Sequence, residues 1–121
     1  MSEPPIDYSE SLPAQPPSRR PPHLRIYQPS PRQLRLDFAG DIDQWSEPLL
    51  NAAEMAAGSA PRADVLIDLG GVTALHEIAL STFSSIHRHT ADQGTSMTFL
   101  RVSEAALRTF DLYRYEDWHR G

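Results

Sequence analysis

The stretch VLIDLGGVT, residues 65–73, decides the fold class of this 121-residue chain. Its first five residues, 65–69, form a nearly continuous apolar run, and the pair Gly70 and Gly71 follows at once. A strand with one solvated face would alternate apolar and polar side chains, whereas a strand buried on both faces of a parallel sheet is apolar throughout. The run therefore predicts a parallel strand over 65–69 that is buried on both faces and ends at the glycine pair.

On both sides of this strand, apolar residues recur at helical spacing. Ser46 is placed to cap a helix that stops at Gly58, and a second helix spans 78–93 with Gly94 at its exit. The predicted apolar stripes are Leu49, Leu50, Ala53, Ala56 and Ala57 in the first helix, and Ala79, Leu80, Phe83, Ile86, His87 and Thr90 in the second. Beyond Gly94, residues 97–102 predict a further strand. Ser103 then caps a third helix whose apolar residues are Leu107, Phe110 and Leu112.

Toward the N-terminus the pattern changes to period two, which is typical of half-buried strands. Two short runs alternate in this way, and Pro29 and Pro31 between them predict a tight connection, so the pair reads as a hairpin. A turn is expected over 39–43. The alternating apolar residues are Leu24 and Ile26 in the first strand and Leu34, Leu36 and Phe38 in the second. The resulting order β-β-α-β-α-β-α predicts a single α/β domain with a mixed central β-sheet and helices packed on it.

Proline marks the boundary of this domain. Nine of the 11 prolines lie in the first 31 residues, and seven of them lie in residues 1–22. Proline removes backbone donors, and this segment offers little apolar area to offset the entropy of ordering. We expect a disordered proline-rich tail over 1–22 and a folded domain over 23–121.

The composition argues against several classes of function. All 11 basic residues are arginine, and 16 acidic residues give a net charge of −5, so a nucleic acid partner is not expected. The chain has no cysteine for a disulfide, a thiolate nucleophile or a zinc–thiolate site. Residues 1–11 contain no apolar run of the kind that a signal peptide or a membrane span requires. We expect a cytoplasmic protein with no cofactor, no metal, no membrane contact and no enzymatic activity.

Three stretches of the chain resemble a known family. Residues 38–43, FAGDID, look like a segment of small and acidic residues between a second strand and a first helix. Residues 65–73 match a central "Asp-Leu-(Ser/Gly)-x-Val" strand and loop, and residues 93–103 match a late strand followed by a serine cap. Over about residues 24–118 the sequence is therefore similar to the STAS domain, the fold of anti-sigma factor antagonists and of the cytosolic tails of sulfate transporters.

This resemblance implies a function in partner switching. Family members of this size bind an anti-sigma factor, often a serine kinase, and so release a sigma factor for transcription. In regulated members that kinase phosphorylates the serine of a "Leu-Asp-Ser-x-Gly" turn at the start of the second helix. The corresponding residues here are Leu75, His76, Glu77, Ile78 and Ala79. His76 therefore replaces the aspartate, Glu77 replaces the phosphoacceptor and Ala79 replaces the glycine.

Glu77 has two interpretations. The amides at a helix N-terminus favour an anion, so Glu77 could partly imitate a phosphoserine, and no kinase could modify it. It could equally be an ordinary acidic residue in a first helical turn. Nearby hydroxyl groups that a kinase could use instead belong to Thr73, Ser81, Thr82, Ser84 and Ser85.

A surface on two segments, 41–45 and 75–85, is the expected docking site for an anti-sigma factor or a protein of the serine-kinase fold. The alternative is a STAS-like module that binds a small ligand or nucleotide, or a scaffold subunit of a regulatory complex. Histidines could suggest a metal site, but His87 and His89 stand two residues apart and point to different faces of their helix. The expected partner-binding residues are Asp41, Asp43, Trp45, Leu75, His76, Glu77, Ile78 and Ser81.

Overall fold

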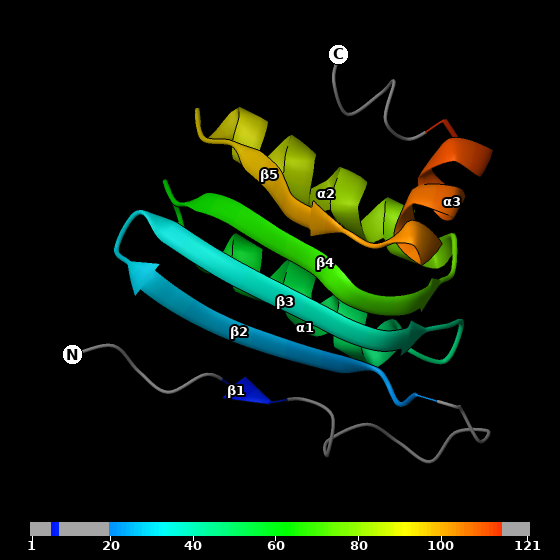
Figure 1. Ribbon diagram of the computed structural model, residues 1–121. Helices are drawn as coiled ribbons and strands as arrows, with labels where there is room; N and C mark the ends of the chain where they lie inside the picture. Colours follow the sequence, from blue (N-terminus) through cyan, green and yellow to red (C-terminus); the bar gives the residue numbers. More distant parts are fainter. Residues whose placement is uncertain (1–5, 8–19, 115–121) are drawn as a thin grey trace.

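The computed structural model describes residues 6–7 and 20–114, which form one mixed sheet and three helices (Figure 1). The strands are β1 (Ile6–Asp7), β2 (His23–Ser30), β3 (Gln33–Ile42), β4 (Asp64–Leu75) and β5 (Met97–Val102). The helices are α1 (Glu47–Gly58), α2 (Ile78–Asp92) and α3 (Glu104–Leu112). From β2 onward this order is the predicted β-β-α-β-α-β-α, so the predicted fold class is confirmed.

The strands lie side by side in chain order, from β1 at one edge to β5 at the other. β1 and β3 pair with β2 in antiparallel orientation, and β3, β4 and β5 run parallel to one another. Right-handed crossovers through helices join parallel strands, which is why α1 and α2 separate β3, β4 and β5 in the sequence. The two-residue strand β1 was not predicted because it is too short to show a period.

The predicted proline-rich tail over 1–22 lies mostly outside the described residues. Where the structure does describe this segment, the chain is in contact with the sheet. Ile6 is paired with Ile26 in the edge strand β2, and the carbonyl oxygen of Arg20 accepts a hydrogen bond of 2.8 Å from the amide of Asp41. Pro22 is buried. The contacts that hold the domain together therefore begin before His23.

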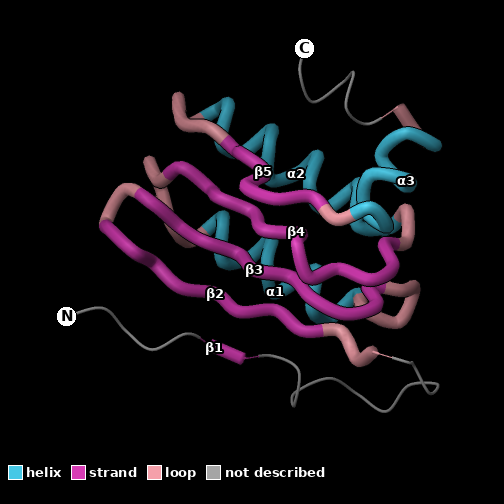
Figure 2. The backbone as a smooth tube through the Cα atoms, in the orientation of Figure 1, coloured by secondary structure: helices cyan, strands magenta, loops and turns pink. Residues whose placement is uncertain are grey.

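Helices α1 and α2 cover one face of the sheet, as the tube view shows (Figure 2). Apolar side chains of the strands point toward these helices and form the core. Phe83 of α2 stands edge-on to Phe38 of β3, at 5.8 Å between ring centroids, and to Phe99 of β5, at 5.3 Å. The largest fully buried apolar residues are Phe83, Phe110, Leu24, Leu36, Ile42, Leu49, Leu50, Ile67, Leu69, Ile86 and Val65.

The opposite face of the sheet, which we call the open face, has no helix over it among the described residues. The prediction that residues 65–69 are buried on both faces therefore holds only in part. Leu66 points to the open face and is only half-buried, and Asp68 points there too but is 2% exposed. Ion pairs rather than a helix bury Asp68, as described below.

Two strands extend further than the sequence predicted. β3 continues through the expected turn to Ile42, and β4 continues through the glycine pair to Leu75. Both strands are irregular there, with register shifts near Ala39 and Gly40. Gly40 has a φ of +78°, which glycine adopts without strain, and a Cβ at Gly71 would lie 3.1 Å from the Cβ of Ala39. These glycines allow close approach within a continuing sheet, so they do not end the strands.

The ends of the helices follow the sequence closely. The Ser103 hydroxyl accepts a hydrogen bond of 3.2 Å from the amide of Ala106, which confirms the predicted cap of α3. Gly94 has a φ of +73° after α2, and the amide of Thr95 donates to the carbonyl of Thr90, which is the arrangement of a Schellman motif. Ser46 stands at the N-cap position of α1, but its hydroxyl does not cap the helix.

Helix α3 packs differently from the prediction. Phe110 is buried as expected, and its partner in the core is Ala106. Of the other two apolar residues expected in this helix, Leu107 is 37% exposed and Leu112 is 74% exposed, so neither belongs to the core. The helix spans only nine residues, and Ala106 and Phe110, four residues apart, already fill its narrow contact with the sheet.

Candidate functional site

The parallel strands β3, β4 and β5 all end at the same edge of the sheet, on the right in Figure 1, and we call this edge the carboxyl edge. Each strand there leads into a helix. The β3–α1 connection contains Asp43 and Trp45, the β4–α2 connection contains His76 and Glu77, and Ser103 alone joins β5 to α3. Functional sites of open α/β sheets form at this edge because loops from different strands converge on it. The two predicted docking segments thus begin at the ends of adjacent strands.

Short hydrogen bonds join these two segments. The amide of His76 donates to the carbonyl of Ile42 at 2.7 Å, and Ile42 is paired with Leu75 in the sheet. The hydroxyl of Thr73 donates to the carboxylate of Asp41. The sheet therefore fixes the spacing between the β3–α1 loop and the start of α2.

Within the β3–α1 loop, the Asp43 carboxylate organises the backbone. Its Oδ1 accepts hydrogen bonds from the amide of Trp45 at 2.9 Å and from the Ser46 hydroxyl at 3.2 Å. The Ser46 hydroxyl in turn accepts from the amide of Asp43 at 3.1 Å. Asp43 is thus a turn residue, and the loop holds Trp45 outward with 49% of its surface exposed.

At the start of α2, His76 contacts the first turn of the helix. Its Nδ1 accepts a hydrogen bond of 3.1 Å from the amide of Ile78, which satisfies one of the free amides of the first turn. Glu77 stands at the N-cap position with its side chain exposed, and its carboxylate makes no capping hydrogen bond. The carboxylate is therefore close to the helix opening without being used by the helix backbone.

Glu77 instead contacts the end of α3. A hydrogen bond from the Tyr113 hydroxyl to the Glu77 carboxylate raises the pKa of Tyr113, with smaller contributions in the same direction from burial and from the glutamate charge. Tyr113 is 48% exposed. The contact brings a third segment, the end of α3, to the carboxyl edge.

The eight predicted partner-binding residues differ in accessibility. Trp45, Glu77 and Ser81 are exposed, and Asp41, Asp43, His76 and Ile78 are half-buried. Leu75 is 7% exposed and belongs to the core, so only its backbone is at the edge. Its carbonyl accepts a hydrogen bond of 2.6 Å from the Thr109 hydroxyl of α3.

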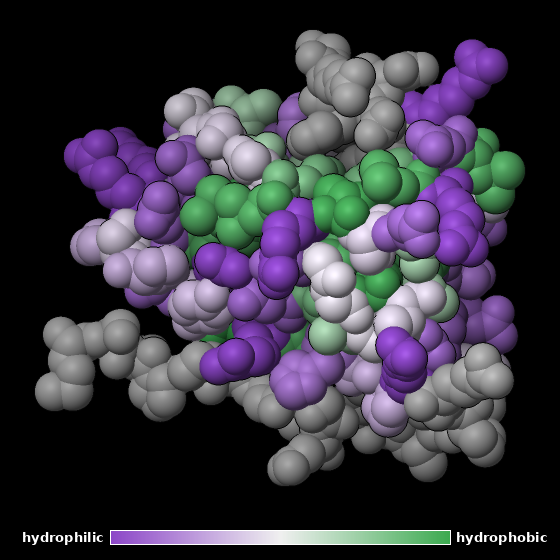
Figure 3. Space-filling view, viewed as in Figure 1, coloured by the Kyte–Doolittle hydropathy of each residue, from purple (hydrophilic) through white to green (hydrophobic). Residues whose placement is uncertain are grey.

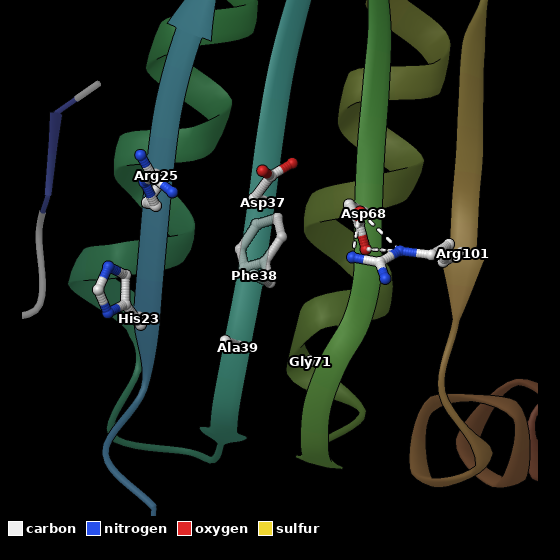
Figure 4. Close-up of a pocket in the computed structure, with 8 residues that line it drawn as sticks. All are labelled: His23, Arg25, Asp37, Phe38, Ala39, Asp68, Gly71 and Arg101. Carbon is white, nitrogen blue, oxygen red and sulfur yellow. Dashed lines mark hydrogen bonds and ion pairs between the residues drawn. The ribbon is translucent and has the colours of Figure 1, made fainter. Parts of the chain in front are cut away.

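Sequence reasoning missed a second group of polar residues, on the open face. The sheet register places Arg25 of β2 opposite Asp37 of β3, Asp37 opposite Asp68 of β4, and Asp68 opposite Arg101 of β5. We call these four residues the charged row (Figure 4). Figure 3 views the same face and shows hydrophilic side chains spread across the sheet. The available signals were an aspartate inside an apolar strand and alternating arginines in the hairpin.

Arg35 holds the two central carboxylates of the charged row together. Two like charges directly opposite each other would destabilise the sheet. Arg35 donates from Nε to Asp37 at 2.7 Å and from Nη2 to Asp68 at 3.0 Å. The Tyr27 hydroxyl donates to the Asp37 carboxylate at 3.2 Å. The Arg35 guanidinium lies 5.7 Å from the centre of the Tyr27 ring. Arg35 thus bridges both acids and offsets the repulsion between them, while Arg101 supplies a second positive charge to Asp68.

Asp68 has the most partners in this network. Its side chain is 3% exposed and contacts Nη2 of Arg101 at 2.9 Å and the amide of Gly70 at 2.8 Å, besides Arg35. Burial alone would raise the pKa of Asp68. Hydrogen bonds from Arg101 and Gly70 and the charges of both arginines outweigh burial and hold its pKa below the ordinary value of 3.8.

The described residues show no group of three histidine, aspartate or glutamate side chains that could hold a metal ion. No helix within the described ranges combines the length and the apolarity that crossing a bilayer demands.

Comparisons with known proteins place this geometry in a family. The structure of the anti-sigma factor antagonist SpoIIAA in its unphosphorylated form is similar, with a TM-score of 0.65 and 10% identity over 78% of this chain and 84% of that chain. An anti-sigma factor antagonist from Mycobacterium paratuberculosis has a TM-score of 0.64 and 20% identity, covering 87% of this chain and 86% of its own. At these identities the likeness shows a shared fold. No curated protein matches the sequence. The model of the STAS domain matches residues 27–119, which is most of the chain, and the protein therefore belongs to the STAS domain family.

Proposed function

We propose that this protein is a non-catalytic regulator that binds an anti-sigma factor, of the serine-kinase type, through its carboxyl edge. The family and two antagonists with the same fold support this kind of function. The observation that carries the proposal is the group of exposed side chains at one edge. Trp45 lies in the β3–α1 connection, Glu77 in the β4–α2 connection and Ser81 in the first turn of α2, and all three side chains are exposed. Exposed tryptophan beside charged groups is typical of protein interfaces.

We further propose that the start of α2 is not a phosphorylation switch in this protein. Glu77 has no hydroxyl group, so a serine kinase cannot transfer phosphate to it. His76 already caps the helix through Nδ1, so the first turn is satisfied in part without an added anion. The fixed charge of Glu77 would then select for a partner that tolerates a carboxylate at this point.

Two measurements test the proposal. Each purified anti-sigma serine kinase of the source organism is titrated against the wild type, and phosphate incorporation from ATP is mapped by mass spectrometry. We expect at least one kinase to bind the wild type without phosphorylating residues 73–85. The double variant His76→Asp with Glu77→Ser should gain phosphate at residue 77.

The matched control is Glu104→Ser, because Glu104 is an exposed acidic residue at the start of another helix on the same edge. It should gain no phosphate and bind like the wild type. Phosphate on wild-type Ser81, Thr82, Ser84 or Ser85 would show that switching persists at another position. Binding that is unchanged by Trp45→Ala and by the double variant would remove the carboxyl edge as the docking surface.

A second candidate function, binding of a small ligand, is favoured by a different observation. The open face contains a hollow that is lined by the four residues of the charged row, on the other side of the sheet from α1 and α2.

A further inference from the structure

The hollow on the open face has a volume of about 210 Å³ and crosses four strands. Two small residues that are paired in the sheet, Ala39 and Gly71, form its floor, and the carboxylates Asp37 and Asp68 line it as well. His23 and Arg25 of β2 line one side, and Arg101 of β5 lines the other (Figure 4). A larger side chain at either floor position would fill the space. The hollow therefore exists because two small residues stand between cationic side chains from separate strands.

The two carboxylates that line the hollow are each paired with arginine. Asp37 and Asp68 share Arg35, and Asp68 also accepts from Nε and Nη2 of Arg101 and from the amide of Gly70. Tyr27 donates to the remaining oxygen of Asp37. A ligand in the hollow therefore meets carboxylate oxygens that each already accept a hydrogen bond.

Arginine donors remain available on both sides. Arg25 lies opposite Asp37 in the sheet, but in the described part of the chain its guanidinium forms no ion pair, and its side chain is exposed. Arg101 has a side chain that is 71% exposed, and the contacts with Asp68 use its Nε and Nη2 and leave Nη1. With Arg35 included, three arginines face two aspartates. This excess positive charge stands out on a chain with a net charge of −5.

Gly70 keeps Arg101 in this position. A Cβ at Gly70 would lie 2.9 Å from Nε of Arg101 and 3.1 Å from Oδ1 of Asp68. Its lack of a side chain allows the guanidinium to lie over the strand, with its plane fixed by Asp68. Guanidinium groups held in this way are pre-organised for planar, multidentate contacts with oxyanions.

We propose that this hollow binds a small phosphate-bearing anion, which Arg25 and Arg101 contact from opposite sides above the floor of Ala39 and Gly71. The source of the phosphate is either free inorganic phosphate or a phosphate monoester of a small metabolite. The volume leaves room for an organic group beside the phosphate. This site lies on the open face and does not depend on the function proposed for the carboxyl edge.

The test is a titration of the full-length protein, monitored by amide chemical shifts at constant ionic strength. The probes are inorganic phosphate, ribose 5-phosphate and, as the uncharged control, ribose. We expect saturable shifts at residues of β2, β3 and β4 around Ala39 and Gly71 with the two phosphates and none with ribose. Tighter binding of ribose 5-phosphate than of phosphate would identify a monoester as the ligand, and equal affinity would identify free phosphate; either result supports the site.

Variants decide whether the site is the one proposed. Arg25→Gln should weaken binding about fivefold, as expected for loss of one partly exposed charge contact. Ala39→Ile should abolish binding because its side chain fills the hollow. The matched control Arg88→Gln removes the same charge from the exposed surface of α2 and should leave the affinity unchanged within about twofold.

Two results would overturn the proposal. One is the absence of saturable shifts with both phosphates at tens of millimolar. The other is binding that Arg25→Gln and Arg88→Gln weaken equally, which would indicate attraction by overall charge only. Because Arg25→Gln alters only an exposed side chain, it remains informative even if Ala39→Ile does not fold.

Discussion

The carboxyl edge and the open face both present charged side chains, and the fold uses them to different degrees. On the open face, Asp68 is 3% exposed and is held by two arginines and a backbone amide. At the carboxyl edge, Glu77 is exposed, its carboxylate does not cap the helix, and its partner Tyr113 is itself 48% exposed. Removing the partners or the charge of a buried carboxylate lowers the free energy of unfolding by several kcal/mol. An exposed carboxylate contributes little to that free energy.

This difference separates structural charge from charge that is free for recognition. A substitution in the charged row should change stability first, and a substitution of the exposed carboxyl-edge residues should change binding first. The predictions below test that separation, beginning with the largest expected effect on the free energy of unfolding.

The largest effect should come from Gly40, close to the carboxyl edge on β3. A Cβ at Gly40 would lie 2.1 Å from the carbonyl oxygen of Pro21, and the residue has a φ of +78°. Neither strain can relax by side-chain rotation, so Gly40→Ala should lower the free energy of unfolding by more than about 3 kcal/mol. Urea denaturation measures this change.

The control for Gly40→Ala is Gly58→Ala, at the end of α1. A Cβ there meets nothing within 4 Å. This variant should be neutral or more stable by up to about 1 kcal/mol, because alanine restricts the unfolded chain. Equal effects of the two variants would contradict the close packing of the segment at Arg20 and Pro21 on β3.

Asp68→Asn should have the next largest effect. The substitution keeps the shape of the side chain and removes the charge that pairs with Arg35 and Arg101. We expect a loss of about 2 kcal/mol, since hydrogen bonds to charged groups contribute about 1.5–3 kcal/mol. Asp111→Asn on the exposed surface of α3 is the control and should change stability by less than about 0.5 kcal/mol. If both variants were equally stable, the charged row would be dispensable for folding.

The same carboxylate predicts a pH dependence. The folded pKa of Asp68 lies below the ordinary value of 3.8, so the unfolded chain takes up this proton first as the pH falls. Its contribution is complete above pH 3.8 and is lost as the pH falls through the folded pKa. The stability difference between wild type and Asp68→Asn should therefore be constant at neutral pH and shrink below about pH 4. A difference that grew on acidification would contradict the assigned direction.

Ser103→Ala should cost about 1 kcal/mol, because it removes the acceptor for the Ala106 amide at the start of α3. Ser103→Asp, which keeps an acceptor at that position, should restore most of the loss. Thermal unfolding of the wild type and the two variants measures both the loss of stability and its recovery. If Ser103→Asp were as unstable as Ser103→Ala, the hydroxyl would act through something other than capping.

Much of the fold could be predicted because its signals are local. The stripe of α1, the Ser103 cap and the glycine at the end of α2 each act within a few residues, and each is where the sequence indicates. The extension of β4 beyond Gly70 could not be predicted, because it depends on the approach of β3 at Ala39. Leu107 and Leu112 are exposed for a similar reason: the width of the contact between α3 and the sheet is a tertiary property.

The two candidate sites also differ in how far the sequence alone predicts them. The carboxyl edge follows from chain order, since parallel strands bring their loops to one edge, and motif residues identify which loops matter. The charged row joins residues from four strands, so it depends on the register of every strand pair. A single sequence shows Asp68 as one polar residue in an apolar run and gives no indication of its arginine partners.

The smallest effect on stability should come from Glu77→Gln. The carboxylate stands at the positive end of α2, where a negative charge contributes about 0.3–1 kcal/mol, and exposure reduces this contribution. We expect a loss of about 0.5 kcal/mol or less by urea denaturation, similar to that of Glu104→Gln in the first turn of α3. The two variants should differ in binding instead: only Glu77→Gln should change the affinity for the anti-sigma partner. A loss above about 1 kcal/mol at Glu77 alone would mean that the fold needs this charge, and its role would then resemble that of Asp68.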